Sequence, residues 1–373
     1  MTTHEEASAS TVSTDKAAAY DTLPLAVGNS SNIRLLDILN NDTNDGDGPI
    51  SCNLRLASLD EKYVALSYMW GTETATKSIK LNGKPFLVRQ NLWDFLHQRR
   101  IDQSRDNESR YLWIDALCIN QASNTERNHQ VGMMGRIYSR ASHVLIWLGA
   151  GNESLAREMD YLASPQAFDR AQANIESVPF SEIIQLCFHP YWRRAWILQE
   201  CVLALVLRLQ CGPKCVCSST LCKILSLSYS YSISEDLRPE HRSASTNCLA
   251  REVLFARQAW HQPSNRHFFT PWERYLPLLG CSDPRDRIYA MVAIMDPAFE
   301  LVPDYNMTAQ DLFVAIVDRI WAVNEGSRVR LSDIARLLEL DFLTTEFKDW
   351  PPLVYQKFRQ YYDKKQGAFS RNQ

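Results

Sequence analysis

A carboxylate, an indole and a guanidinium stand at helical spacing near the middle of the chain. We expect a helix over residues 192–205, in which Arg193, Trp196 and Glu200 share one face because they lie three, four and seven positions apart. The indole can stack on a flat heterocycle, and the arginine can hold a phosphate. The three residues therefore predict a small-molecule site. The alternative is that Glu200 only forms an ion pair with Arg193 or Arg194, while Trp196 belongs to the core.

A second group of polar residues follows two apolar runs that are typical of buried strands. Ser67 and Tyr68 end one run, and Asp115 directly follows the other. In open α/β sheets, ligands lie beyond the carboxyl ends of the strands. Asp115, Asn120 and Gln121 could therefore line the same cleft as Ser67 and Tyr68. In the alternative, Asp115 caps the following turn and the two amides satisfy backbone groups of a loop.

The cysteines offer two further possibilities. Cys118 could be a nucleophile, but no histidine is placed by the sequence to activate it, and a buried, inert thiol is the alternative. Four cysteines between residues 211 and 222 could bind zinc, but they lack paired Cys-x2-Cys spacing. The chain also lacks the P-loop, His-Glu-x2-His and Gly-x-Ser-x-Gly motifs. We predict no metal site and no resident cofactor.

The elements that would position these residues alternate between strands and helices. The turn formed by Asn82 and Gly83 predicts a β-hairpin, because both residues tolerate the positive φ angles of a type I′ turn. Ser123 and Glu126 form a capping box ahead of an amphipathic helix, and Asn91 is expected to cap another helix. Strands are expected at 33–39, 50–59, 63–68, 78–81, 84–88, 111–114 and 144–148, and a helix at 191–208.

This order predicts an α/β fold. Its mainly parallel sheet would be flanked by helices, because strands that alternate with helices pair in parallel. A hairpin-rich N-terminal lead-in would precede the sheet, and a mostly helical C-terminal region would follow it.

Composition places the chain among ordinary globular proteins. Of its 373 residues, 45% are hydrophobic and 22% are charged, and the net charge of -3 argues against a nucleic-acid partner. The N-terminus lacks the features of a signal peptide, and no apolar run approaches the roughly 18 residues of a membrane span. We expect a cytoplasmic protein with cysteines as thiols. We also expect a disordered tail over 1–31, an α/β domain over 32–215 and a mainly helical region over 216–373.

Four blocks of sequence carry a family resemblance. They are residues 63–71 (YVALSYMWG), 112–121 (LWIDALCINQ), 126–149 and 191–200 (YWRRAWILQE), and in this order they resemble the fungal heterokaryon incompatibility (HET) domain. A thinner resemblance continues at 283–289 and 303–305. The resemblance implies a role in fungal non-self recognition and programmed cell death, with protein partners and homo-oligomerisation on activation.

The HET domain is in turn similar to the TIR domain, and some TIR domains cleave NAD with one helical glutamate. On that pattern the sheet would be TIR-like and Glu200 would be the catalytic residue. A carboxylate under the ribose stabilises the oxocarbenium-like transition state, and nicotinamide leaves as a neutral ring without a general acid. NAD would then be a substrate, and whether the chain is an enzyme stays open. The residues expected to bind that substrate are Ser67, Tyr68, Asp115, Arg193 and Trp196.

Overall fold

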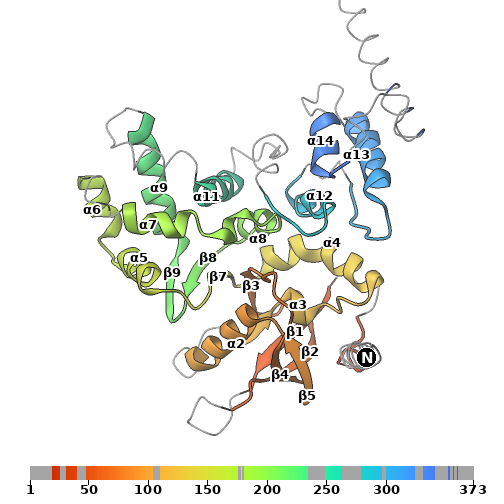
Figure 1. Cartoon of the computed structure of the whole chain (residues 1–373), viewed down its shortest axis with the longest axis horizontal. Coiled ribbons are helices and arrows are strands. Elements are labelled where there is room, and N and C mark those ends of the chain that lie inside the picture. Colours follow the sequence, from red (N-terminus) through yellow and green to blue (C-terminus); the bar gives the residue numbers. More distant parts are fainter. Residues whose placement is uncertain are drawn as a thin grey trace, which may run out of the picture.

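The protein is built around one mixed nine-stranded β-sheet with helices packed about it (Figure 1). The computed structural model describes residues 19–25, 31–39, 48–103, 110–174, 178, 180–233, 248–262, 279–295, 300–323 and 331–340, together with 352, 356 and 359. The strand order is β5-β4-β2-β1-β6-β3-β7-β8-β9. The strands are β1 (Asn32–Ile38), β2 (Ser51–Ser58), β3 (Val64–Tyr68), β4 (Lys77–Leu81), β5 (Lys84–Val88), β6 (Tyr111–Trp113), β7 (His143–Trp147), β8 (Leu207–Cys211) and β9 (Lys214–Cys217).

The centre of the sheet is parallel, as the alternation of strands and helices predicts. Strands β6, β3, β7 and β8 pair in parallel, and every residue of β3 and β7 is buried. Strands covered on both faces read as continuous apolar runs, which explains why the sequence identified them. The antiparallel pairs β1–β2, β4–β5 and β8–β9 flank this centre.

The helices cover the sheet and build the C-terminal region. They are α2 (Gln90–Gln103), α3 (Asp115–Cys118), α4 (Asn124–Arg140), α5 (Glu153–Ala163), α6 (Ala167–Ala173), α7 (Phe180–Cys187), α8 (Ile197–Val202), α9 (Ser218–Ile233), α11 (Leu249–Trp260), α12 (Asp286–Tyr289), α13 (Ala309–Val323) and α14 (Leu331–Leu337), with the 3₁₀ helices η2 (Pro190–Arg193) and η5 (Val292–Ile294). The described part of the region after residue 216 is mainly helical, as predicted. No described helix is long and apolar enough to cross a membrane.

Two local predictions meet different outcomes. The hairpin is confirmed, because Asn82 and Gly83 adopt φ angles of 51° and 78° between the antiparallel strands β4 and β5. The cap at Asn91 is wrong, because α2 begins one residue earlier and the Asn91 side chain is used elsewhere. Its amide donates to the carbonyl of Met69 at 2.7 Å and accepts from the indole of Trp147 at 2.9 Å.

The helix expected over 191–208 is also wrong. The chain instead forms η2, an extended residue at Arg194, the short helix α8 and then strand β8. The cause is distant in sequence: Arg194 forms a parallel β-bridge with Gly280, and Ala195 donates its N–H to the Gly280 carbonyl at 3.0 Å. A tertiary contact therefore overrides the local helical pattern.

The C-terminal region packs directly on the sheet domain. Helix α11 lies against α8, and η5 lies against α4. In Figure 1, α12, α13 and α14 stand above α4. The contact between η5 and α4 is close, because a Cβ atom added to Gly135 would lie 2.2 Å from the Cβ of Ala293. Strand β9 crosses the domain boundary predicted at residue 215.

Part of the predicted N-terminal tail is ordered against the domain. Residues 19–25 lie within the stretch expected to be disordered, yet Tyr20 and Leu25 are buried. The Tyr20 hydroxyl donates to the carbonyl of Leu117 at 3.1 Å, and Arg34 Nε donates to the carbonyl of Leu23 at 2.8 Å. Composition alone predicted disorder for this segment because composition holds no information about these two tertiary hydrogen bonds.

Candidate functional site

A buried polar cluster lies at the carboxyl end of β3. Ser67 and Glu200 are each 1% exposed, and the Ser67 hydroxyl donates a hydrogen bond to Glu200 Oε2. The Tyr191 hydroxyl lies 2.5 Å from Ser67 Oγ and 3.3 Å from Cys201 Sγ. Since Ser67 has one proton and gives it to Glu200, Tyr191 donates to Ser67 and the Cys201 thiol donates to Tyr191. A chain of four side chains thus ends on the Glu200 carboxylate.

The Glu200 carboxylate is also held by a guanidinium. Arg194 Nη1 and Nη2 donate to its two oxygens at 3.1 and 3.2 Å, and the Arg194 side chain is 17% exposed. Burial alone would lower the pKa of Arg194, but the adjacent Glu200 carboxylate raises it above its ordinary value. Such two-point, charge-assisted contacts fix geometry as well as charge.

A second carboxylate stands beside this pair. Asp115 begins α3, and both of its oxygens accept from the indole Nε1 of Trp70, at 3.2 and 3.0 Å. Burial, followed by the charge of Glu200, raises the pKa of Asp115 to about 6, against the lowering effect of Arg194. The titration of Asp115 is therefore governed by burial and by the neighbouring charges of Glu200 and Arg194.

Ser67, Asp115 and Glu200 therefore lie in one neighbourhood. Tyr68, the last residue of β3, is buried, and burial, followed by the charge of the Asp115 carboxylate, raises its pKa well above the ordinary value. Asp115 is held by Trp70 and does more than cap a turn. The Ser67–Glu200 pair lies beneath the carboxyl end of a parallel strand, where α/β proteins place their sites.

Two expected site residues lie elsewhere. Arg193 is exposed, and its neighbour Arg194 pairs with Glu200. The side chain of Trp196 hydrogen-bonds Asp286 of the C-terminal region. Both differences have one cause, since the chain is extended at Arg194 and α8 starts only at Ile197. The three residues do not share a helix face.

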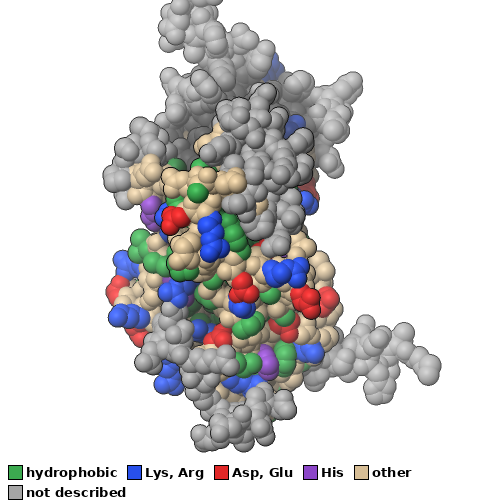
Figure 2. Space-filling model, turned by 90° about the vertical axis from the view of Figure 1, so that its left-hand side faces the viewer, with side chains coloured by type: hydrophobic (Ala, Val, Ile, Leu, Met, Phe, Trp, Pro, Cys, Tyr) green, Lys and Arg blue, Asp and Glu red, His purple; other side chains and the backbone are tan. Residues whose placement is uncertain are grey.

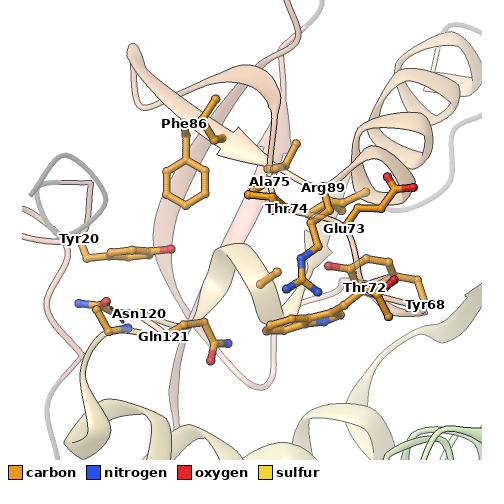
Figure 3. A pocket seen from close by; sticks show the side chains of 16 residues that line it. Tyr20, Tyr68, Thr72, Glu73, Thr74, Ala75, Phe86, Arg89, Asn120 and Gln121 are labelled. Atoms are coloured by element: carbon orange, nitrogen blue, oxygen red, sulfur yellow. Dashed lines mark hydrogen bonds between the residues drawn. The ribbon is translucent and has the colours of Figure 1, made fainter. Parts of the chain in front are cut away.

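A cavity of about 500 Å³ opens next to the cluster (Figure 3). Tyr68 and Trp70 line it, and the Trp70 indole donates its hydrogen bond to Asp115. Asn120 and Gln121 line it too, as expected of a shared cleft. Ser67, Asp115 and Glu200 are not among its lining residues.

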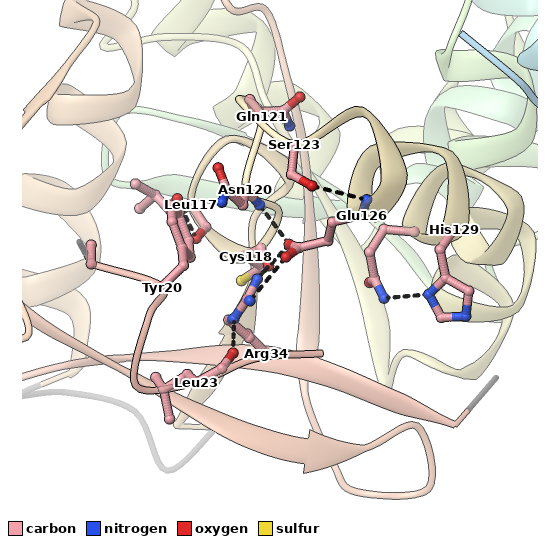
Figure 4. A network of polar contacts seen from close by, with 12 residues as sticks. Tyr20, Leu23, Arg34, Leu117, Cys118, Asn120, Gln121, Ser123, Glu126 and His129 are labelled. Atoms are coloured by element: carbon pink, nitrogen blue, oxygen red, sulfur yellow. Dashed lines mark hydrogen bonds and ion pairs between the residues drawn. The ribbon is translucent and has the colours of Figure 1, made fainter. Parts of the chain in front are cut away.

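A second polar network stands behind the cavity (Figure 4). Arg34, which is 1% exposed, donates to both oxygens of Glu126, at 2.5 and 3.0 Å, and to the carbonyl of Cys118 at 3.1 Å. Glu126 Oε1 also accepts from the N–H of Asn120 at 2.7 Å. The network therefore holds the loop after α3 in place. Glu126 accepts a hydrogen bond from this loop through its side chain, and it also lies in the first turn of α4. An arginine inside an otherwise apolar strand was the signal that could have found it.

The structure bears on the two cysteine hypotheses within the part of the chain that it describes. Within it, no group of three or more His, Cys, Asp or Glu side chains could hold a metal ion. None of the ten cysteines forms a disulfide. Cys118 is fully buried, and burial raises the pKa of its thiol to about 12. The inert alternative therefore describes Cys118.

Comparison with known proteins identifies one domain within the chain. Residues 63–200 match the family model described as Heterokaryon incompatibility protein (HET). The chain contains a HET domain. The match begins one residue before β3 and ends on Glu200, so the HET domain includes Ser67, Asp115, Arg194 and Glu200.

A curated relative agrees with this assignment. The chain is 36% identical over 164 residues to "Heterokaryon incompatibility protein 6, OR allele" of Neurospora crassa. The aligned part covers 41% of this chain and 24% of that protein, so the chain spans about a quarter of its relative's length. No solved structure gives a significant match.

Proposed function

We propose that this HET-domain protein is an effector of fungal non-self recognition that triggers programmed cell death by assembly and contact with protein partners. The match to the HET family and to a heterokaryon incompatibility protein carries the proposal. The expected cytoplasmic location and homo-oligomerisation on activation belong to it.

The state of Glu200 supports an effector that acts without catalysis. Its carboxylate is 1% exposed and is occupied by Ser67 and by both terminal nitrogens of Arg194. In this arrangement the cluster links β3 to α8 and has a structural role. The surface fits a contact role, since Figure 2 shows positive and negative side chains interspersed with apolar ones on the face it presents.

The effector proposal is tested by expressing the chain in a filamentous fungus and counting viable cells. Glu200→Gln keeps the side-chain shape and removes the charge, so this variant should still kill cells. Thermal unfolding of the purified variant checks that the fold is retained. Loss of killing by a folded Glu200→Gln protein would contradict the proposal.

A second candidate is hydrolysis of NAD, with Glu200 as the catalytic residue. The observation that favours it is the cluster of Ser67, Asp115, Arg194 and Glu200 beside a cavity walled by aromatic side chains. The bond between nicotinamide and ribose would break with its electrons leaving on nicotinamide, and water would add to the ribose carbon. Glu200 would stabilise the positive ribose, which requires Tyr68 and Trp70 to move aside.

Incubation of concentrated protein with NAD tests this candidate. Nicotinamide release should be abolished by Glu200→Gln and retained by Lys80→Gln, which removes an exposed charge on β4. If assembled wild-type protein releases no nicotinamide, the hydrolase candidate fails, while the effector proposal stands.

A further inference from the structure

The cavity beside the charge cluster has two chemically different ends. Figure 3 shows Tyr20, Phe86, Asn120 and Gln121 gathered at one end and Arg89, Thr72 and Tyr68 at the other. A volume of about 500 Å³ is within the range of small-molecule sites. One end therefore presents rings and amides, and the other presents the Arg89 guanidinium, hydroxyl groups and the Glu73 carboxylate.

Arg89 makes the second end suitable for an anion. Its Nη1 donates to the carbonyl of Gly71 at 2.5 Å, and its guanidinium lies 5.7 Å from the centre of the Trp70 ring. Among the described residues, no carboxylate forms an ion pair with Arg89, although Glu73 lines the same cavity. The remaining N–H groups of the half-buried guanidinium can bind a phosphate or a carboxylate.

The first end is suitable for a planar heterocycle. Tyr20 is buried and held in place by its bond to Leu117, and Phe86 is 8% exposed. Gln121 Nε2 donates to the Asp115 carbonyl at 3.0 Å, which leaves Oε1 as an acceptor. Asn120 Oδ1 accepts from the N–H of Ala122 at 3.2 Å, which leaves Nδ2 as a donor. The guanidinium of Arg34 lies 4.8 Å from the centre of the Tyr20 ring. Aromatic rings that line the cavity, next to one amide donor and one amide acceptor, suit a nucleobase.

We propose that this cavity binds a nucleoside monophosphate, with the base against Tyr20 and Phe86 and the phosphate on Arg89. The aromatic end selects a flat ring, the amides select an edge with donors and acceptors, and the guanidinium selects an anion. The proposal goes beyond both functions above, because it concerns reversible binding in a cavity that Ser67, Arg194 and Glu200 do not line.

Calorimetric titration of the full chain with AMP, GMP, UMP, adenosine and inorganic phosphate tests the proposal. At least one monophosphate should bind with a Kd below about 1 mM, and adenosine and phosphate should each bind about tenfold more weakly or worse. Arg89→Met should weaken the monophosphate about tenfold and leave adenosine unchanged, and Arg89→Lys should recover part of the loss. Retained adenosine binding shows that the cavity of the Arg89→Met protein is intact.

Two further variants separate the ring contact from general charge effects. Phe86→Leu keeps the apolar volume and removes the π-face, so adenosine and the monophosphate should weaken together. Lys80→Gln removes a cation from the same hairpin outside the cavity and should change nothing. The proposal is overturned if no monophosphate binds at concentrations up to about 10 mM, or if Arg89→Met binds monophosphate and adenosine as the wild type does. Neither result depends on NAD cleavage or on cell death.

Discussion

Replacement of Asp115 by asparagine should stabilise the protein at neutral pH. The asparagine can still accept the hydrogen bond from Trp70, but it carries no charge next to Glu200. Burial and Glu200 raise the pKa of Asp115 from 3.8 to about 6. That difference corresponds to up to about 3 kcal/mol of charging energy in the folded state.

The sign of the pH dependence follows from this pKa. Between pH 3.8 and about 6 the folded protein binds more protons at Asp115 than the unfolded chain does. The contribution of Asp115 to the free energy of unfolding is therefore full below pH 3.8 and is lost as the pH rises through about 6. Asp115→Asn removes this loss, so it should gain most over the wild type above pH 6 and little at pH 4.

Urea unfolding at a series of pH values measures the difference directly. The free energy of unfolding of Asp115→Asn minus that of the wild type should rise with pH by about 1–3 kcal/mol. Asp60→Asn, at an exposed position paired with Arg140, is the control and should give a nearly flat profile. A difference that stays flat for Asp115→Asn, or a variant less stable than the wild type at pH 8, would refute the reasoning.

Three further changes test the packing around the site. Arg34→Met leaves the partly buried Glu126 carboxylate without its cation and should cost about 3–5 kcal/mol in the free energy of unfolding; a loss below about 1 kcal/mol in urea unfolding would contradict the role of this pair. Gly135→Ala should loosen the packing of η5 on α4, because the added Cβ would clash with Ala293. Limited proteolysis should then cleave the C-terminal region sooner than in the wild type. Gly132→Ala is the control and should behave as the wild type, because the nearest neighbour of its added Cβ lies 3.9 Å away. A chain ending after residue 215 should be insoluble, because it ends inside β9 and loses α11 from the surface of α8; a soluble, folded fragment would support the predicted boundary.

The sequence was informative where structure is local. Apolar runs identified β3 and β7 because both strands are buried on each face, and the hairpin followed from Asn82 and Gly83 because φ angles above zero suit few other residues. Ser67 and Asp115 were found because they end or follow recognisable strands, and Glu200 was found from its spacing in an expected helix and from the family resemblance; the three lie in one neighbourhood.

The sequence failed where contacts span long distances. Arg193 does not share a helix face with Glu200, and Arg194, which the alternative interpretation also named, pairs with Glu200 instead, because a bridge to Gly280, more than 80 residues away, holds the chain extended at Arg194. Tyr20 is ordered because Leu117 and Arg34 anchor its segment. No periodicity in a single sequence encodes such pairings.

The effector proposal is tested most directly by cell death from a variant that has lost both charges of the central ion pair. Arg194→Gln combined with Glu200→Gln removes the guanidinium and the carboxylate of the pair together, so the fold should survive where a single change weakens it. We expect a fungus that expresses this folded double variant to lose viability as it does with the wild type. Survival of those cells, with the double variant folded and equally abundant, would contradict an effector that works by assembly and would point to chemistry at Glu200.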